Sequence, residues 1–402
     1  MDARASAAGD AGPGARVHIY VLMDALGWSI AQEHGFLRDA LGHRRPLRTC
    51  LGYSSGAIPT MLTGAPPAEH GHWNLLYLDP HGSPFGWMRG LPAALTTRLD
   101  HRWGRRGCTW LGRHACGLGP GFECAVRPDL LPWFNWAEKR HLFQPGSLAP
   151  VPNVFDHWRE AHLRFRIYSY RHGSDQSLIR RACRDVASGR ADTVFLYLCE
   201  MDHILHLHRD EPEVIQAALD AYAGQLEALL AAARARDPQM RFRLFSDHGM
   251  APVRQRVDLL TPLRRRGWQS PQDYLAVLDS TMLRFWFFRP SVRDDISAWL
   301  HGLSCGHILE ESELRREGVC FEDARFGDLI FLLDPGTMVA EGEFNGRGWN
   351  PCGMHGYHPA DADSDAVLLS NCAHDLHLKT IQDLFTPLNE PLLAPRGSRP
   401  VQ

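Results

Sequence analysis

The chain has 402 residues, of which 44% are hydrophobic, so it is long enough for one large α/β domain with insertions or for two domains. Lysine and arginine (43) nearly balance aspartate and glutamate (46), and the net charge is −3. This balance offers no basic surface for a nucleic acid polymer or an anionic membrane, and we expect neither as a partner. The basic stretches at 101–107 and 263–267 are interpreted as solvated faces, with the lining of a pocket for an anionic substrate as the alternative.

The sequence contains no apolar run of 18 or more residues, and its first residues lack the apolar core of a signal peptide. A cytoplasmic location is therefore expected. The ten cysteines are then expected to be reduced thiols that serve packing.

The first predicted strand lies close to the N-terminus. Residues 1–15 are rich in alanine and glycine and are predicted to be disordered. Residues 17–23 form an apolar run, VHIYVLM, which is typical of a buried parallel strand. Asp24 follows this run directly, and in open α/β sheets ligands bind at the carboxyl ends of the strands.

Three further predicted strands also end at polar side chains. They are residues 47–53 before Ser54, 193–198 before Asp202, and 241–246 before Asp247 and His248. Helical patterns separate the strands, the longest at 213–236. Strand and helix in alternation predict an α/β fold, a doubly wound, mostly parallel sheet flanked by helices.

Two irregular regions interrupt this pattern and set the expected domain limits. The predicted catalytic core runs over 16–251 with an insertion at 75–150, is followed by a cap at 252–345, and resumes at 346–390; the tail at 391–402 is predicted to be disordered. The cap is expected to contain strands at 281–288 and 327–333. The tryptophans of these regions (Trp73, Trp87, Trp103, Trp110 and Trp286) suit either stacking on a substrate ring or ordinary packing.

Two short motifs combine metal-ligating residue types. Asp202 and His206 are four residues apart, so on a helix they share one face and can hold one metal ion. Asp247 and His248 are adjacent at a strand end, where Gly249 allows the backbone to bend. Each motif alone also has a purely structural interpretation. The first can be a chance pair on a surface helix, and the second an ordinary turn.

Ser54 is the candidate nucleophile. It opens a predicted helix, SGAIPTMLTG, whose free N–H groups would favour a phosphoryl oxygen. Metal coordination would activate its hydroxyl. An N-cap role fits the same position, and Ser55 competes for the catalytic role.

Taken together and in order, these segments resemble the alkaline phosphatase superfamily, and most closely its nucleotide pyrophosphatase/phosphodiesterase branch. Ser54 lies ten residues before Gly64 of a Thr-Gly pair, as the nucleophile of that branch does, and Ser55 does not. The other matching positions are Asp24, Pro67, His70, Gly71, Glu200, Asp202, His206, the Ser-Asp-His-Gly-Met at 246–250 and the His-Gly-Tyr at 355–357.

The resemblance implies two metal sites, expected to hold two zinc ions per chain, with manganese or another divalent ion left open. Asp202, His206 and His355 would hold one ion, and Asp24, Asp247 and His248 the other, with Ser54 bound to the second as nucleophile. Asn74 is the expected substrate-binding residue, although it lies one residue out of step with the family's asparagine. The family's asparagine after the nucleophile is missing, and His358 stands where the family often has aspartate or asparagine.

The implied activity is metal-dependent hydrolysis of a small phosphorylated substrate, either a phosphodiester, a nucleotide pyrophosphate or a phosphomonoester. The alternatives are a sulfatase, a phosphonate hydrolase, a phosphomutase or a relative that binds a phospholigand without turnover. A sulfatase is poorly matched because positions 56 and 58 are glycine and isoleucine. A homodimer is left open.

Overall fold

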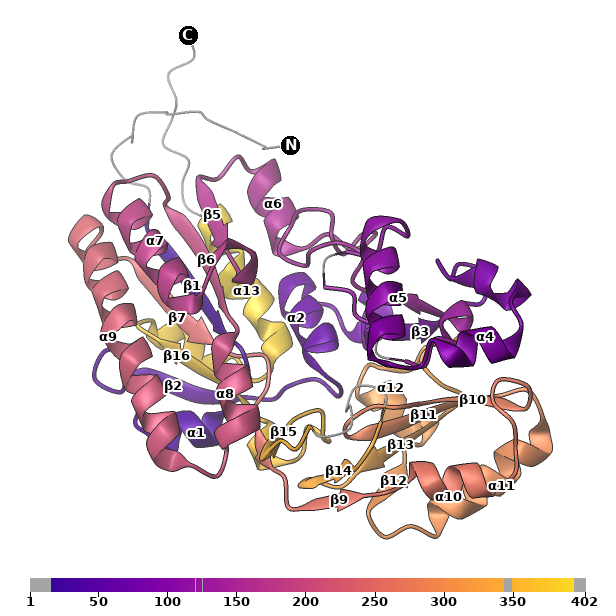
Figure 1. Cartoon of the computed structure of the whole chain (residues 1–402). Coiled ribbons are helices and arrows are strands. Elements are labelled where there is room, and N and C mark those ends of the chain that lie inside the picture. The colour runs from indigo at the N-terminus through magenta and orange to yellow at the C-terminus, as the bar shows by residue number, and fades with distance from the viewer. Residues whose placement is uncertain (1–15, 120, 125, 343–348, 394–402) are drawn as a thin grey trace.

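The computed structural model describes residues 16–119, 121–124, 126–342 and 349–393, so the predictions for 1–15 and for the tail from 394 onward lie outside the described residues. Figure 1 shows a large sheet between two layers of helices, with a second lobe beside it. No described helix is both long enough and apolar enough to cross a bilayer. All ten cysteines are free thiols.

The main sheet has six strands in the order β2-β16-β7-β1-β6-β5. Their bounds are His18–Met23 (β1), His43–Leu47 (β2), Phe165–Tyr168 (β5), Thr193–Leu198 (β6), Arg241–Phe245 (β7) and Ala366–Ser370 (β16). The pairs β5–β6, β6–β1 and β1–β7 are parallel, and β16 is antiparallel to both of its neighbours. The predicted mostly parallel, doubly wound α/β sheet is confirmed.

Both faces of the sheet are covered, which explains the continuous apolar runs of its central strands. Alternate residues of β1 enter two different cores: Val21 packs in the core on one face and Leu22 in the core on the other. The first face carries α1 (Trp28–Glu33), α7 (Asp175–Ala187) and α9 (Pro212–Arg236), and the second carries α2 (Ser54–Thr63), α6 (Val154–Glu160) and α13 (Phe385–Leu388) (Figure 1).

The strand predicted at 47–53 is wrong, because β2 ends at Leu47. After a single bridge at Arg48 the chain leaves the sheet. The Leu51 carbonyl accepts a 2.6 Å hydrogen bond from the Trp73 indole, and Gly52 has a φ of 121°, which a strand residue with a side chain does not adopt. Packing against Trp73 therefore turns this segment toward the start of α2.

The second lobe contains an antiparallel sheet in the order β10-β11-β13-β12. Its elements are Tyr274–Leu278 (β10), Met282–Phe287 (β11), Gly306–Ile308 (β12) and Leu329–Leu333 (β13), with α10 (Leu260–Arg265), α11 (Pro290–His301) and α12 (Glu311–Arg316). These elements fall within the predicted cap, 252–345, and include its two expected strands.

The insertion at 75–150 packs on this sheet. It contains β3 (Leu76–Leu78), β4 (Phe134–Trp136), α4 (Ala93–Arg98) and α5 (Arg102–His114). Trp136 of β4 shares one hydrophobic cluster with Leu275 and Trp286 of the antiparallel sheet. The insertion and the cap thus form one wall beside the main sheet.

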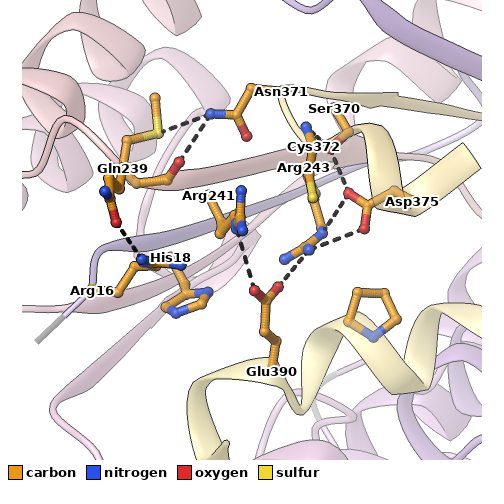
Figure 2. Close-up of polar contacts among 12 residues, drawn as sticks. Arg16, His18, Gln239, Arg241, Arg243, Ser370, Asn371, Cys372, Asp375 and Glu390 are labelled. Carbon is orange, nitrogen blue, oxygen red and sulfur yellow. Dashed lines mark hydrogen bonds and ion pairs between the residues drawn. The ribbon is translucent and has the colours of Figure 1, made fainter. Parts of the chain in front are cut away.

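A buried ion-pair network fastens the C-terminal segment to the main sheet (Figure 2). Arg243 of β7 is 2% exposed and makes two hydrogen bonds to Asp375, at 2.8 and 3.0 Å. It also pairs with Glu390 at 2.5 Å, and Arg241 reaches the same carboxylate at 3.3 Å. Arg243 therefore neutralises two acidic groups supplied by the last part of the chain.

Replacing Arg243 tests how much this network stabilises the fold. Arg243→Ala leaves Asp375 buried without its cation, so we expect a loss of about 3–5 kcal/mol in the free energy of unfolding. Arg241→Ala removes only a more exposed partner of Glu390 and should cost less than about 1 kcal/mol. Urea denaturation of both variants measures the difference, and equal losses would contradict the assigned role of Arg243.

Candidate active site

The carboxylates and imidazoles predicted to bind metal come from four segments that meet at the carboxyl edge of the main sheet. Asp24 follows β1, and its N–H donates to the Leu198 carbonyl at 2.9 Å, which continues the ladder to β6. Asp202 and His206 lie on α8 (Glu200–His208), which begins just after β6. Asp247 and His248 follow β7.

His355 reaches the same edge through a short hairpin-like pairing. The strand β15 (Gly353–Met354) pairs antiparallel with β8 (Ala251–Pro252), which follows the Asp247-His248 segment. As a result the rings of His248 and His355 stack with centroids 3.9 Å apart. Two residues more than a hundred positions apart in the sequence are thus in direct contact.

The seven metal-site positions fall into two groups plus the serine. Ligating atoms of Asp24, Asp247 and His248 all lie within 4.8 Å of one another, and so do those of Asp202, His206 and His355. The first group is buried and the second is half-buried. The structure therefore brings together the same two sets that the resemblance implies.

Local contacts fix the carboxylates of the buried group. The Tyr197 hydroxyl donates a short hydrogen bond to Asp24 Oδ2, and the Ala25 N–H donates to Asp247 Oδ1 at 3.2 Å. The Thr49 hydroxyl holds the Asp247 backbone carbonyl at 2.7 Å. Gly249 is required at the bend, because an added Cβ would lie 2.1 Å from the Asp363 carbonyl oxygen.

Backbone carbonyls orient two of the imidazoles. His248 Nδ1 lies 2.9 Å from the Gly249 oxygen and His206 Nδ1 lies 2.8 Å from the Gly353 oxygen. A carbonyl only accepts, so in each neutral ring Nδ1 carries the proton and Nε2 presents a lone pair. His206 Nε2 then faces Asp202 Oδ1 at 3.3 Å, an acceptor against an acceptor. A cation between them satisfies both.

Buried polar atoms without partners mark the same place. Among the described residues, Asp24 Oδ1, Asp202 Oδ1, Asp247 Oδ2 and His355 Nδ1 are buried and make no hydrogen bond. Buried carboxylates are stable when they are paired or coordinate a metal. Carboxylate and imidazole donors in two compact sets fit divalent cations, including zinc.

The electrostatics of the protein alone also point to missing positive charge. Burial raises the pKa of Asp24 well above its usual range, and the nearby carboxylates of Asp247 and Asp202 raise it further. Burial likewise raises the pKa of Asp202, and it lowers the pKa of His355 well below the ordinary value. Bound cations would favour the ionised carboxylates and the neutral imidazoles that coordination requires.

Ser54 and Ser55 have different surroundings. Ser54 is the first residue of α2, and its Oγ lies 2.9 Å from His248 Nε2, at the edge of the buried group. Ser55 is buried, and its hydroxyl donates to the Trp73 carbonyl at 2.9 Å. Only Ser54 presents its hydroxyl to the cluster of carboxylates and imidazoles.

Ser54 opens onto a cavity of about 360 Å³. Asn74 lines this cavity and is buried, with its amide nitrogen 3.6 Å from the Met282 sulfur. His358, in contrast, points away to Glu313 of α12, at 3.3 Å. The cavity therefore joins the predicted nucleophile and the predicted substrate-binding asparagine, and it leaves His358 outside.

Sequence reasoning missed several residues that shape the site. Tyr197 gave a weak signal in the sequence. After Thr193 it is the only residue of β6 with a hydroxyl group, in a run that is otherwise apolar. The outer wall of the cavity comes from Glu138, His141, Leu142, Phe143, Tyr170 and Trp349, whose segments have no regular periodicity. Trp73 and Trp286 are buried in packing, whereas Trp87, Trp103 and Trp110 are exposed.

A family model for type I phosphodiesterase / nucleotide pyrophosphatase matches residues 53–358. Among curated proteins, comparison finds no match. Among solved structures, murine ectonucleotide pyrophosphatase / phosphodiesterase 5 superposes with a TM-score of 0.64 at 13% identity, over 96% of this chain and 98% of that one. An inactive variant of that murine protein in complex with AMP superposes with a TM-score of 0.63 at 13% identity, over 96% and 97% of the two chains.

Phosphonoacetate hydrolase from Sinorhizobium meliloti 1021, in complex with phosphonoformate, superposes with a TM-score of 0.54 at 16% identity, over 94% of this chain and 96% of that one. At these identities the structural matches show a common fold. The family model covers Ser54, both residues of the Asp247-His248 pair and the whole half-buried group from Asp202 to His355. The chain therefore belongs to the type I phosphodiesterase / nucleotide pyrophosphatase family.

Proposed function

We propose that this protein hydrolyses phosphodiesters with Ser54 as the nucleophile and with two divalent cations, zinc being the leading candidate. The observation that carries the proposal is the position of Ser54 Oγ, 2.9 Å from His248 Nε2 and next to two sets of ligating atoms. Family membership supports hydrolysis of a phosphoric ester as the reaction class.

Asp24, Asp247 and His248 would hold one cation, and Asp202, His206 and His355 the other. When bound, the two cations would neutralise the charge of the phosphoryl group and lower the pKa of the attacking hydroxyl. The orphaned carboxylate oxygens support this assignment, because each has a lone pair directed at no described donor.

With the cations bound, the reaction is a balanced sequence of two displacements. In the first, Ser54 Oγ gives up its proton and forms a bond to phosphorus, while the bond from phosphorus to the leaving alkoxide breaks. The proton passes through solvent to the alkoxide, which departs as an alcohol. The N-terminal N–H groups of α2 favour the negative charge that develops on the phosphoryl oxygens. In the second, water attacks phosphorus and the bond to Ser54 breaks; the proton that the water loses restores the Ser54 hydroxyl.

The cavity wall favours a diester over a monoester. Apolar and aromatic side chains dominate it, among them Ile58, Leu75 and Phe143, and Arg140 is the one arginine or lysine among the described lining residues. The Arg140 guanidinium donates to the Gly146 carbonyl at 3.1 Å. A diester carries one negative charge and a second organic substituent, which this wall can cover. The AMP complex of the murine relative makes a nucleotide ester a reasonable first substrate.

The direct test combines metal analysis with two model esters. Protein with close to two divalent ions per chain should hydrolyse bis-p-nitrophenyl phosphate faster than p-nitrophenyl phosphate, and chelation should abolish both activities. Hydrolysis that persists after complete removal of transition metals would refute the two-cation proposal. Faster turnover of the monoester would refute the diester preference alone.

Tyr197→Phe tests the outer support of the buried cation site. The substitution removes the hydroxyl that donates to Asp24 Oδ2, so we expect divalent-cation affinity to fall roughly 10- to 100-fold. Tyr168→Phe is the matched control, because its hydroxyl also donates to a carboxylate, that of Asp185, outside the site. Calorimetric titration of metal-free protein gives both affinities, and an equal change in the two variants would contradict the role of Tyr197.

Ser54→Ala should lower kcat by roughly a thousandfold or more, because a nucleophile and the groups that activate it act as a unit. Ser55→Ala should change kcat by less than about tenfold, since its hydroxyl is bonded to the Trp73 carbonyl and contacts neither group of carboxylates and imidazoles. Steady-state rates on bis-p-nitrophenyl phosphate are compared at equal metal content. The reverse order of the two effects would assign the nucleophile to Ser55.

Glu138 predicts a pH dependence of substrate binding. Burial raises the pKa of this cavity residue to about 7, so the side chain is neutral below that pH and anionic above it. The anion repels a phosphodiester, and KM should therefore rise roughly fivefold as pH increases through 7. Glu138→Gln should flatten this rise, whereas Glu227→Gln on the exposed face of α9 should leave it intact; parallel profiles in all three proteins would contradict the assignment.

A further inference from the structure

Positive charge and exposed tryptophan coincide in one part of the insertion. Residues 86–118 contain six arginines and one acidic residue, Asp100, although the whole chain has a net charge of −3. Asp100 pairs with Arg105 at 2.8 Å. This stretch therefore carries a net positive charge, whereas the remaining residues of the protein together carry a net negative charge.

The tryptophans of α5 share the outer face of the helix. Trp103 and Trp110 are seven residues apart, which places them on one side of the helix, and they are 69% and 61% exposed. The guanidinium groups of Arg102 and Arg106 lie 5.7 and 5.2 Å from the Trp103 ring. Each exposed aromatic ring therefore lies beside cationic groups or, for Trp110, beside His114.

The opposite side of α5 is fixed against the insertion. Cys108 and Gly112 are buried there, and an added Cβ on Gly112 would lie 2.4 Å from the Phe122 ring. The helix cannot rotate to bury its tryptophans without losing this close packing. The outer face, defined by Arg102, Trp103, Arg106 and Trp110, is thus held toward solvent by the fold.

The segment before α5 adds further exposed apolar side chains. Trp87 is 56% exposed, Leu95 of α4 is 48% exposed and Leu91 is 37% exposed. Figure 1 shows α4 and α5 at the side of the molecule away from α7 and α9. Large exposed apolar groups in one region of a folded protein mark an interaction surface.

We propose that the outer face of α5 docks onto the surface of an anionic phospholipid membrane. Tryptophan partitions into the interface between headgroups and acyl chains, and arginine binds the phosphate groups there. The net charge of −3 led to the expectation that a membrane would not be a partner. The local distribution of charge is the better guide, because electrostatic attraction to a surface acts over about one Debye length.

Two other occupants fit less well. A second copy related by a twofold axis would bring its own arginines against the same arginines, which repel. A single-stranded nucleic acid would need aromatic rings at the spacing of stacked bases, whereas residues seven apart on a helix are separated by roughly 10 Å along its axis. A membrane surface needs neither symmetry nor regular spacing.

The insertion that carries the docking face also supplies part of the cavity wall. The chain leaves α5 at His114 and supplies Gly119 to the cavity lining five residues later. The docking itself is measured without substrate, so its failure and the failure of the proposed hydrolysis are separate results.

Sedimentation with vesicles tests the proposal on the full chain. We expect binding to vesicles of equimolar phosphatidylcholine and phosphatidylserine, weaker binding at high salt, and little binding to pure phosphatidylcholine. Arg102→Gln/Arg106→Gln should reduce the partition coefficient by on the order of tenfold, and Trp103→Ser/Trp110→Ser by a similar factor. Arg180→Gln/Arg184→Gln on α7 removes the same charge from another surface and should bind like the wild type.

Each variant is first shown to have the thermal stability of the wild type and its rate on a soluble p-nitrophenyl ester. With this control, loss of folding is not mistaken for loss of docking. The proposal is overturned if the wild type fails to bind anionic vesicles, binds neutral vesicles equally well, or loses as much binding in the α7 control as in the α5 variants. Capture of a single-stranded oligonucleotide without vesicle binding would assign the face to nucleic acid, and an α5-dependent change of oligomeric state without vesicle binding would assign it to a second copy.

Discussion

The convergence of three buried or half-buried carboxylates at one sheet edge is the constraint on which the rest of the site depends. Asp24, Asp202 and Asp247 repel one another, and each keeps an oxygen that meets no described donor. A fold tolerates this arrangement only if cations complete it or if the carboxylates hold protons. The surrounding groups favour the first solution, because the neutral imidazoles of His206 and His248 present lone pairs, not N–H groups, to the same space.

One of the strands that lead to these carboxylates, β7, is anchored by the C-terminal segment. Asp247 follows the carboxyl end of β7, while Arg243 within that strand binds Asp375 and Glu390 (Figure 2). The C-terminal segment thus anchors the strand that leads to Asp247 and His248. Two carboxylates of that segment, Asp375 and Glu390, pair with the buried Arg243 guanidinium in the same strand.

The sequence predicts the parts of this arrangement that depend on local pattern. The run at 193–198 matches β6, because a strand buried on both faces is apolar at nearly every position. The run at 241–246 matches β7 within one residue, although it also contains Arg241 and Arg243. The end of β2 could not be predicted, since it depends on Trp73, which lies more than twenty residues away in sequence. The link from Tyr197 to Asp24 and the contact of His248 with His355 are likewise products of tertiary packing.

The function of the insertion at 75–150 is the hardest to predict from the sequence. Its cavity residues, such as Glu138 and Phe143, lie in irregular chain, where neither a helical nor a strand period marks the inner face. Its one long helix, α5, has a clear period, yet its two largest apolar residues, Trp103 and Trp110, are exposed, while Cys108 and Gly112 are buried. An average over the whole chain hides such a face, because acidic residues elsewhere cancel its charge. Only the fold separates the basic, aromatic side of α5 from the side that packs on Phe122, and so makes a local surface property visible.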